Sequence, residues 1–164
     1  GKDKKLVRKA IDIITSGNIE SRLKNLPKLA IEINKKLLQF FAINDVNIHY
    51  IPPTALRFSV KIDKKLVAKE LIGDGIVIAT PFGSTGYFKS ITRKSFKKGI
   101  GVAFNNTTEK TRPLILSDEA KIEVFITRGR GHIAIDNNPI LIRLREGDKV
   151  RVMKSKHVAK ILFL

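Results

Sequence analysis

The chain has 164 residues, and 43% of them are hydrophobic, which is enough for the core of one folded domain and excludes a disordered chain. It has no cysteine, which excludes disulfides and thiol catalysis, and its three scattered histidines do not predict a metal site. Thirty-two Lys and Arg against 15 Asp and Glu give a net charge of +17, which favours phosphorylated small molecules, nucleic acid or an anionic surface as ligands.

The sequence also bears on where the protein works. No apolar run reaches the roughly 20 residues that a membrane helix needs. The first residues, GKDKKLVRKAI, lack the apolar segment of a secretory signal. We therefore expect a cytoplasmic protein with no membrane partner.

The first predicted element is an amphipathic helix over residues 4–16, with Asp3 as its N-cap and Gly17 as its C-cap. We expect residues 1–28 to form a helical lead-in and residues 29–164 to form a β-rich domain. The helix places its apolar side chains on one stripe: Leu6, Val7, Ala10, Ile11 and Ile14.

After the helix, short runs of β-branched and aromatic residues alternate with turn signals, a pattern typical of strands. About nine or ten strands with few helices predict a mainly β fold of two packed, largely antiparallel sheets, similar to a β-sandwich. The predicted strands cover residues 29–37, 40–50, 55–63, 65–73, 75–81, 99–104, 121–128, 132–144, 149–153 and 159–164. The predicted turns cover residues 62–65, 129–131, 136–139 and 146–148.

One stretch, GDGIVIATPFGSTGY at 73–87, joins an apolar strand to a loop of small and hydroxyl residues. Four consecutive apolar residues at 76–79 leave no polar face, so this strand should be buried on both sides. Pro81 then takes the chain out of the sheet, because proline has no N–H to donate to a strand neighbour. The loop therefore begins directly after a buried strand.

The loop itself offers several groups to a ligand. Gly83 and Gly86 allow close approach of the backbone, Ser84 and Thr85 supply hydroxyls, and Tyr87 supplies a ring with a polar tip. A short helix capped by Ser84 or Thr85 would direct free N–H groups towards an anion or a sugar hydroxyl. The alternative is a plain connection between a strand and a helix.

A second polar site falls within a predicted strand, in AINDVNI at 42–48. Asn44 and Asp45 are unfavourable inside strands, and a carboxylate beside a carboxamide can hold the vicinal hydroxyls of a ribose. Both can face one ligand only at a bulge or a strand end, since neighbouring strand residues point to opposite faces. A bulge or hairpin turn without a ligand is the alternative, and Asp74 similarly either lies at the rim of a site or forms an Asx-turn.

Basic residues follow the loop directly. The segment 88–99 contains five positive charges, which either neutralise phosphate or form a solvated face: Lys89, Arg93, Lys94, Lys97 and Lys98. A second basic stretch, Arg-Gly-Arg-Gly at 128–131, is similar to the Arg-Gly segments of RNA-binding proteins. A single copy between two strands nevertheless favours a hairpin turn.

These stretches together resemble the C-terminal domain of the NAD kinase family. DGIVIATPFGSTGY (74–87) is similar to that family's Asp-Gly, apolar strand, Thr-Pro-x-Gly-Ser-Thr-Ala-Tyr signature, with Gly86 in place of Ala. INDV (43–46) is similar to its Asn-Glu motif, with Asp45 in place of Glu. The resemblance continues through GHIAIDNNP and LREGDKVRV and covers nearly the whole chain.

The resemblance implies transfer of the ATP γ-phosphate to the 2′-hydroxyl of the NAD adenosine ribose, with NAD and ATP as substrates and Mg²⁺ or another divalent cation on the ATP phosphates. It also implies a homo-oligomer, dimer or tetramer, and a short helix after the loop. The implied NAD contacts are Asn44, Asp45, Asp74, Thr85, Gly86, Tyr87 and Ser90. Thr80, Gly83 and Ser84 would shape the loop, and Lys89, Arg93 and Lys94 are candidate phosphate contacts.

The chain departs from the family in one respect that concerns activity. The family's Gly-Gly-Asp-Gly motif, whose Asp is the expected base, belongs to an N-terminal α/β domain and is not in this sequence. We therefore expect no catalytic residue and no turnover in this chain alone. One alternative is a basic β-domain that binds nucleic acid, but with no Trp and two Tyr the chain has few aromatic residues on which bases could stack. The other alternative is a related lipid kinase, for which the sequence shows no apolar groove.

Overall fold

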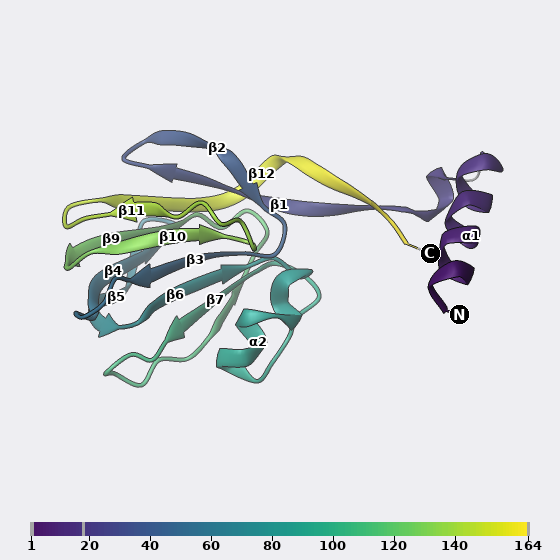
Figure 1. Cartoon of the computed structure of the whole chain (residues 1–164). Coiled ribbons are helices and arrows are strands. Elements are labelled where there is room, and N and C mark those ends of the chain that lie inside the picture. Colours follow the sequence, from purple (N-terminus) through teal and green to yellow (C-terminus); the bar gives the residue numbers. More distant parts are fainter. Residues whose placement is uncertain (1, 18, 164) are drawn as a thin grey trace.

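The computed structural model describes residues 2–17 and 19–163. It confirms the predicted mainly β fold: two six-stranded sheets, antiparallel at every strand pair, pack face to face (Figure 1). Sheet A has the order β2-β1-β12-β9-β4-β5, and sheet B the order β11-β10-β3-β6-β7-β8. The helices are α1 (Lys2–Thr15) and α2 (Tyr87–Thr92), with short 3-10 turns at Glu20–Arg22 and Gly83–Thr85. The strands are β1 (Leu23–Ile33), β2 (Lys36–Ala42), β3 (Asp45–Tyr50), β4 (Leu56–Ile62), β5 (Lys65–Gly73), β6 (Gly75–Ala79), β7 (Ile100–Asn105), β8 (Leu114–Leu116), β9 (Ile122–Arg128), β10 (Gly131–Ile135), β11 (Ile142–Leu144) and β12 (Lys149–Leu162).

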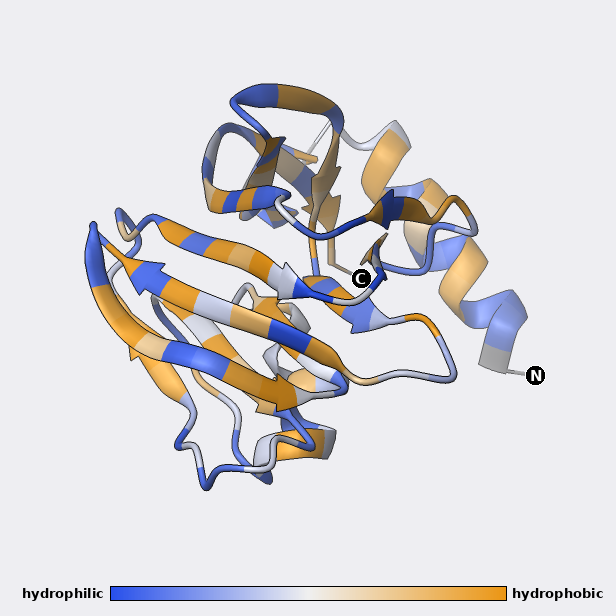
Figure 2. Ribbon diagram, turned by 90° about the vertical axis from the view of Figure 1, so that its left-hand side faces the viewer, coloured by the Kyte–Doolittle hydropathy of each residue, from blue (hydrophilic) through white to orange (hydrophobic). Residues whose placement is uncertain are grey.

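The main core lies between the two sheets. Along most strands apolar residues alternate with polar ones, as the changing colours in Figure 2 show, and the apolar set faces the partner sheet. Burial of each large side chain contributes roughly 1.5–3 kcal/mol to folding. Among the fully buried members are Ile31, Phe58 and Ile122 from sheet A, and Ile48, Ile76 and Ile133 from sheet B.

Strand β6 is buried on both faces, as its apolar sequence predicts. Its second face is covered by α2, which inserts Phe88 against Val77, Ala79 and Ala103 to form a smaller core. This packing fixes α2, and the loop before it, on the outer face of sheet B. The loop after β6 therefore has a rigid support on each side.

Several predicted strand boundaries are wrong, and one of them matters for the site. Residues 40–50 are not one strand: β2 ends at Ala42 in sheet A, and β3 begins at Asp45 in sheet B. The two residues between them carry the chain from one sheet to the other. Asn44 and Asp45, which the sequence marked as unfavourable inside a strand, lie at this break, but the sequence does not show that the strands on its two sides belong to different sheets.

Other boundaries differ in simpler ways. The predicted strand at 29–37 is the end of β1 and the start of β2, joined by a turn at Asn34 and Lys35, both with positive φ. The strands predicted at 149–153 and 159–164 form a single long β12, and β8 was not predicted. The predicted turns at 62–65, 129–131, 136–139 and 146–148 are confirmed as breaks between strands.

The N-terminal part extends from the sandwich. Strand β1 begins at Leu23, within the stretch expected to be helical, and pairs with the end of β12 in a ribbon that leads towards α1 (Figure 1). Asp3 lies inside α1 and does not cap it, whereas Gly17 follows the helix with φ +72°. Neither α1 nor another described helix has the length and apolar character needed to cross a bilayer. Of the apolar residues of α1, Ile13 is buried, while the exposed ones are Leu6, Val7, Ile11 and Ile14.

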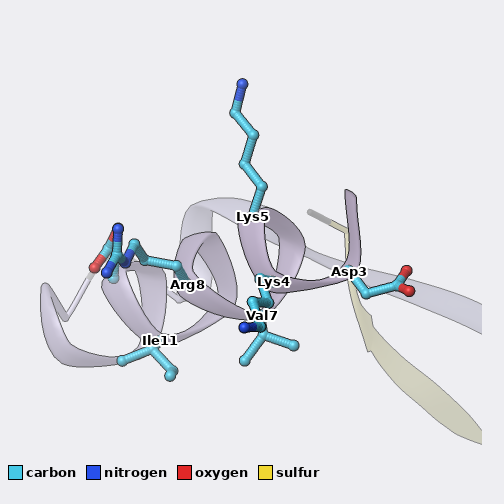
Figure 3. Close-up of a pocket in the computed structure, with 7 residues that line it drawn as sticks. Asp3, Lys4, Lys5, Val7, Arg8 and Ile11 are labelled. Carbon is cyan, nitrogen blue, oxygen red and sulfur yellow. The ribbon is translucent and has the colours of Figure 1, made fainter. Parts of the chain in front are cut away.

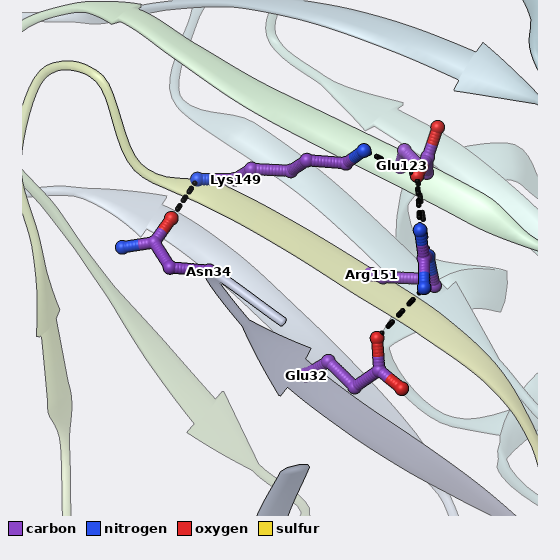
Figure 4. A network of polar contacts seen from close by, with 5 residues as sticks. All are labelled: Glu32, Asn34, Glu123, Lys149 and Arg151. Atoms are coloured by element: carbon purple, nitrogen blue, oxygen red, sulfur yellow. Dashed lines mark hydrogen bonds and ion pairs between the residues drawn. The ribbon is translucent and has the colours of Figure 1, made fainter. Parts of the chain in front are cut away.

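A polar network lies on the outer face of sheet A (Figure 4). Glu123 is buried and accepts ion-pair hydrogen bonds from Lys149 at 2.6 Å and Arg151 at 2.9 Å, and Arg151 also reaches Glu32 at 2.9 Å. The hydrogen bond from Lys149, supported by Arg151, lowers the pKa of Glu123 in spite of its burial. The network connects β1, β12 and β9 across the middle of the sheet.

Candidate functional site

A cavity of about 800 Å³ beside α1 is not a convincing site. Figure 3 shows its labelled residues on successive turns of one helix, so no second element closes it. Most of its side chains are exposed, and the polar ones carry mixed charges. The lining residues are Asp3, Lys4, Lys5, Val7, Arg8, Ile11 and Asp12.

A second cavity, of about 520 Å³, lies on the outer face of sheet B and joins the two polar stretches singled out in the sequence. One wall comes from the crossing between β2 and β3, another from the loop after β6, and a third from the end of β10. The predicted acid-amide pair and the predicted loop thus share one cavity. Its lining residues are Asn44, Asp45, Asn47, Phe82, Gly83, Thr85, Gly86, Tyr87, Ala134, Asp136 and Asn137.

The loop is held directly against the crossing between the sheets. At Gly83 a Cβ would lie 2.1 Å from the carbonyl oxygen of Asn44, so only glycine permits this approach. Thr80 donates its backbone N–H to Asn44 O at 2.9 Å, donates its hydroxyl to Ile43 O, and accepts the Gly83 N–H at 3.1 Å. The positions of the two polar stretches are therefore coupled through backbone contacts.

Ser84 stabilises the other side of the loop. Its buried Oγ lies 2.7 Å from Pro81 O and 3.0 Å from Phe96 O, and it accepts the Phe96 N–H at 3.2 Å. The interpretation of Ser84 or Thr85 as a helix cap is wrong, because α2 starts after Gly86 without a side-chain cap. A helix of six residues also offers no strong anion site at its start. Ser84 thus acts inside the loop, away from the cavity.

Asp136 organises the crossing from the far side and was not predicted as a site residue. Its carboxylate accepts backbone N–H groups from Ile43 at 2.9 Å, Asn44 at 2.7 Å and Asp45 at 3.0 Å. The sequence assigned Asp136 to a turn, and it does lie just after β10 with φ +50°. Nothing local in the sequence links it to residues more than ninety positions earlier.

Charges in the cavity shift the ionisation of two groups. Burial, and then the nearby charge of Asp136, raise the pKa of Asp45 to about 6. Burial, followed by the charges of Asp74 and Asp45, also raises the pKa of Tyr87, whose hydroxyl accepts a hydrogen bond from Asn105 at 3.0 Å. At neutral pH the Tyr87 hydroxyl is therefore uncharged and can donate a hydrogen bond. Asp45, in contrast, titrates at a pH of about 6.

Asn47 and Phe82 line the cavity but were not predicted. Asn47 lies two residues after Asp45 on β3 and shares its face of the sheet, a relationship that strand alternation could have revealed. Its Oδ1 is buried with no hydrogen-bond partner among the residues that the structure describes. A buried acceptor left unpaired costs about 1–3 kcal/mol, so it favours a ligand that donates to it.

The remaining predicted residues do not line this cavity. Asp74 lies at the opposite end of β6 and accepts a hydrogen bond from Asn106 at 3.2 Å. Ser90 is exposed on α2, with its hydroxyl donating to Tyr87 O at 2.7 Å. The three basic candidates are exposed along and just after α2: Lys89, Arg93 and Lys94.

The described residues contain no group of three or more His, Cys, Asp or Glu side chains placed to hold a metal ion. Two of the histidines predicted to be scattered are in fact neighbours, since the rings of His49 and His132 lie 5.7 Å apart across β3 and β10. His157 lies elsewhere, against Phe41. None of the three histidines lines the 520 Å³ cavity.

Comparison with known proteins finds similar sequences and a similar fold. Residues 20–164 match the sequence profile of the ATP-NAD kinase C-terminal domain. An NAD kinase of Polaromonas naphthalenivorans is 30% identical over 126 residues, which cover 74% of this chain and 43% of that protein.

Two solved structures share the fold. Yeast NADH kinase in complex with NADH superposes with a TM-score of 0.80 at 20% identity, covering 96% of this chain and 48% of that one. An Archaeoglobus fulgidus NAD kinase in complex with ATP gives 0.72 at 18% identity, covering 92% of this chain and 59% of that one. The chain thus spans about half the length of the relatives that it matches.

Proposed function

The chain belongs to the ATP-NAD kinase family, whose C-terminal domain it matches, and on that premise we propose that it is the dinucleotide-binding part of an NAD kinase. The whole enzyme would transfer the γ-phosphate of ATP to the 2′-hydroxyl of the adenosine ribose of NAD, which yields NADP. A relative of known structure binds NADH and another binds ATP, which supports these substrate classes.

One observation carries the proposal: Asn44, Asp45 and Tyr87 line the same cavity, beside an Asn47 carbonyl oxygen that has no partner within residues 2–17 and 19–163. Asp45 and Asn44 would accept hydrogen bonds from ribose hydroxyls or the adenine amino group, and Asn44 can also donate. The Asn47 oxygen needs a donor, and a hydroxyl or amino group supplies one. An adenosine moiety contains all of these groups.

The other residues take roles that follow from their places around the cavity. Thr85 and Gly86 would contact the adenosine, with the Tyr87 ring packing beside it. Ser90, three residues after Tyr87 on α2, would lie near the adenosine, and Asp74, at the opposite end of β6, would face the nicotinamide end. Exposed positive charges near α2 would attract its phosphates: Lys89, Arg93 and Lys94.

These 164 residues alone would bind the dinucleotide but would not catalyse its phosphorylation. They contain no Gly-Gly-Asp-Gly motif to supply a base, and phosphoryl transfer also needs charge neutralisation around the ATP phosphates. We propose that Mg²⁺ or another divalent cation enters on ATP as part of the substrate, and that the enzyme works as a homo-oligomer. NADP formation by this chain alone would contradict this part of the proposal.

Calorimetric titration with NAD and NADP tests the proposal directly. We expect saturable binding that Tyr87→Ala weakens about tenfold or more, since base–aromatic stacking contributes about 1–3 kcal/mol. The matched control is Phe40→Ala, which removes a partly exposed aromatic side chain from β2, outside the cavity. The control should bind as the unchanged chain does.

A short single-stranded oligonucleotide at two salt concentrations separates the main alternative. Nucleic-acid binding through phosphates weakens steeply with salt, whereas hydrogen-bonded recognition of a dinucleotide in a cavity depends on salt much less. Strong, salt-sensitive oligonucleotide binding together with no measurable dinucleotide binding would overturn the assignment. If Tyr87→Ala and Phe40→Ala weaken NAD binding equally, the proposal that the adenosine lies in this cavity is wrong.

A further inference from the structure

We propose a second ligand site, at the opposite end of β3 from the dinucleotide cavity, where Arg130, Arg143 and Arg145 bind a small molecule that carries two or more phosphoryl groups. The inference is independent of the proposed kinase function. It rests on a cavity of about 490 Å³ whose lining is Ile51, Arg130, Arg143, Leu144 and Arg145.

The strand register brings the three arginines to one face. Arg143 on β11 is paired with His132 on β10, and Arg130 lies two residues before His132. Arg130 directly precedes β10 and Arg145 directly follows β11, and both line one cavity with Arg143. Between them, Leu144 points inwards and is buried. The outer face at this corner is therefore lined by guanidinium groups.

These charges have no acidic partner in the cavity. Among the described residues, no salt bridge includes Arg130, Arg143 or Arg145. The two acids nearest to Arg145 in the sequence are engaged or lie elsewhere: the Asp148 carboxylate accepts the backbone N–H of Arg145, and Glu146 lines a different cavity. Like charges on neighbouring strands are unfavourable, so a bound anion would relieve their repulsion.

The choice of basic residue at this end also points to phosphate. The chain has 22 lysines and ten arginines, yet the cavity is lined by three arginines and no lysine. Arginine presents a planar fork of N–H donors that matches two phosphate oxygens, whereas lysine acts as a point charge. Selection for charge or solubility alone would not exclude lysine here. The pattern favours bidentate recognition of an anion with several oxygens.

The site is separate from the dinucleotide cavity and suits a small molecule. The two cavities share no lining residue, and the five steps of β3 from Asp45 to Tyr50 span about 17 Å. No aromatic ring is among the residues that line the arginine cavity, and the neighbouring rings of Tyr50, His49 and His132 pack against one another. Three guanidinium groups in one hollow match a compact ligand with several negative charges.

Calorimetry with inorganic tripolyphosphate tests the site. The test variant is Arg143→Gln/Arg145→Gln, and the control is Lys36→Gln/Lys65→Gln, which removes the same charge from exposed positions on β2 and β5. We expect the arginine pair to weaken binding at least tenfold and the lysine pair to weaken it less than threefold. All four side chains are exposed, and thermal unfolding will verify that both variants fold.

Two further variants make the result specific. Arg143→Lys/Arg145→Lys keeps the charge, so binding should remain weakened if the forked donors matter. Tyr87→Ala should leave tripolyphosphate binding unchanged, which separates this site from the dinucleotide cavity. The ring protons of His132, the cross-strand neighbour of Arg143, should shift in NMR spectra during the titration.

Four outcomes would overturn the proposal. If tripolyphosphate does not bind at concentrations up to about 1 mM, the proposed site does not exist, because a dissociation constant above this value means negligible binding. Equal weakening by the arginine and lysine pairs, or full binding by the Lys variant, would leave only diffuse attraction to a basic protein. A single-stranded oligonucleotide that binds through these arginines much more tightly than tripolyphosphate would assign the surface to nucleic acid instead.

Discussion

The Asp136 carboxylate accepts a 2.7 Å hydrogen bond from the backbone N–H of Asn44, a residue 92 positions earlier in the chain. The same carboxylate also holds the N–H groups of Ile43 and Asp45. It therefore fixes the segment where the chain crosses from sheet A to sheet B. Asn44 and Asp45 owe their common orientation towards the cavity to this anchor, which lets both serve one ligand.

Replacement of Asp136 should loosen the crossing and weaken dinucleotide binding together. Asp136→Ala leaves three N–H groups without their acceptor, and we expect a loss of about 2–4 kcal/mol in the free energy of unfolding. Asp136→Asn keeps one acceptor oxygen and tolerates the positive φ, so its loss should be smaller. Urea unfolding and NAD calorimetry measure both effects.

The control for this pair is Glu109→Gln, which removes one negative charge from an exposed side chain outside the cavity. It should alter stability by less than about 0.5 kcal/mol. If Asp136→Ala binds NAD as tightly as the unchanged chain, the anchoring role of Asp136 for the site is wrong.

The two glycines of the loop should respond differently to the same change. Gly83→Ala places a methyl group 2.1 Å from the Asn44 carbonyl oxygen, so backbone must shift, and we expect a loss of about 1–3 kcal/mol or more. Gly86→Ala meets its nearest atom at 3.5 Å, an ordinary van der Waals contact, so the added methyl group displaces nothing. Thermal unfolding of the two variants compares them, and equal losses would contradict the close packing of Gly83 on Asn44.

Stability should fall as the pH rises through the titration of Asp45. Burial and Asp136 raise its pKa from 3.8 to about 6, so between these values the folded state binds more protons than the unfolded state. The resulting penalty develops from about pH 4 to pH 6 and persists above it. With allowance for solvent screening, it amounts to about 1–2 kcal/mol.

Asp45→Asn removes this charge and should be more stable than the unchanged chain at pH 7–8, with the difference disappearing below about pH 4. Chemical unfolding at pH 4, 6 and 8 measures the difference at each pH. A constant difference across this range would show that Asp45 does not titrate as a buried carboxyl. Among the described residues, the side chain of Asp45 has no hydrogen-bond partner, so asparagine changes little besides the charge.

Glu123 should show the opposite dependence on pH. Because Lys149 and Arg151 lower its pKa, the folded state binds fewer protons, and its contribution is present above the unfolded pKa and is lost as the pH falls. Glu123→Gln leaves two cations without their shared partner, and we expect a loss of about 1–2 kcal/mol at pH 7, since both cations remain partly solvated.

The matched control is Glu119→Gln, which breaks an exposed ion pair with Lys154 and should cost less than about 0.5 kcal/mol. Urea unfolding at pH 7 and pH 3 compares the two variants. A Glu123 variant that loses no more stability than the Glu119 variant would show that the network in Figure 4 contributes little.

The sequence by itself determined the elements whose physical cause is local. Four apolar residues at 76–79 predicted a strand buried on both faces, Pro81 and the glycines predicted the loop, and the turn residues at 62–65 and 129–131 predicted tight hairpins. Each of these depends on the conformational preferences or the burial of residues within a few positions.

Only the tertiary structure decided which of these elements meet. The period of a strand shows which side chains share a face, but not which strand lies beside it, because pairing energy comes from partners far along the chain. The crossing at Asn44, the carboxylate of Asp136 beneath it and the arginines gathered by β10 and β11 all arise from such long-range pairing. A local sequence pattern contains no information about contacts between residues some ninety positions apart, and the candidate site depends on such contacts.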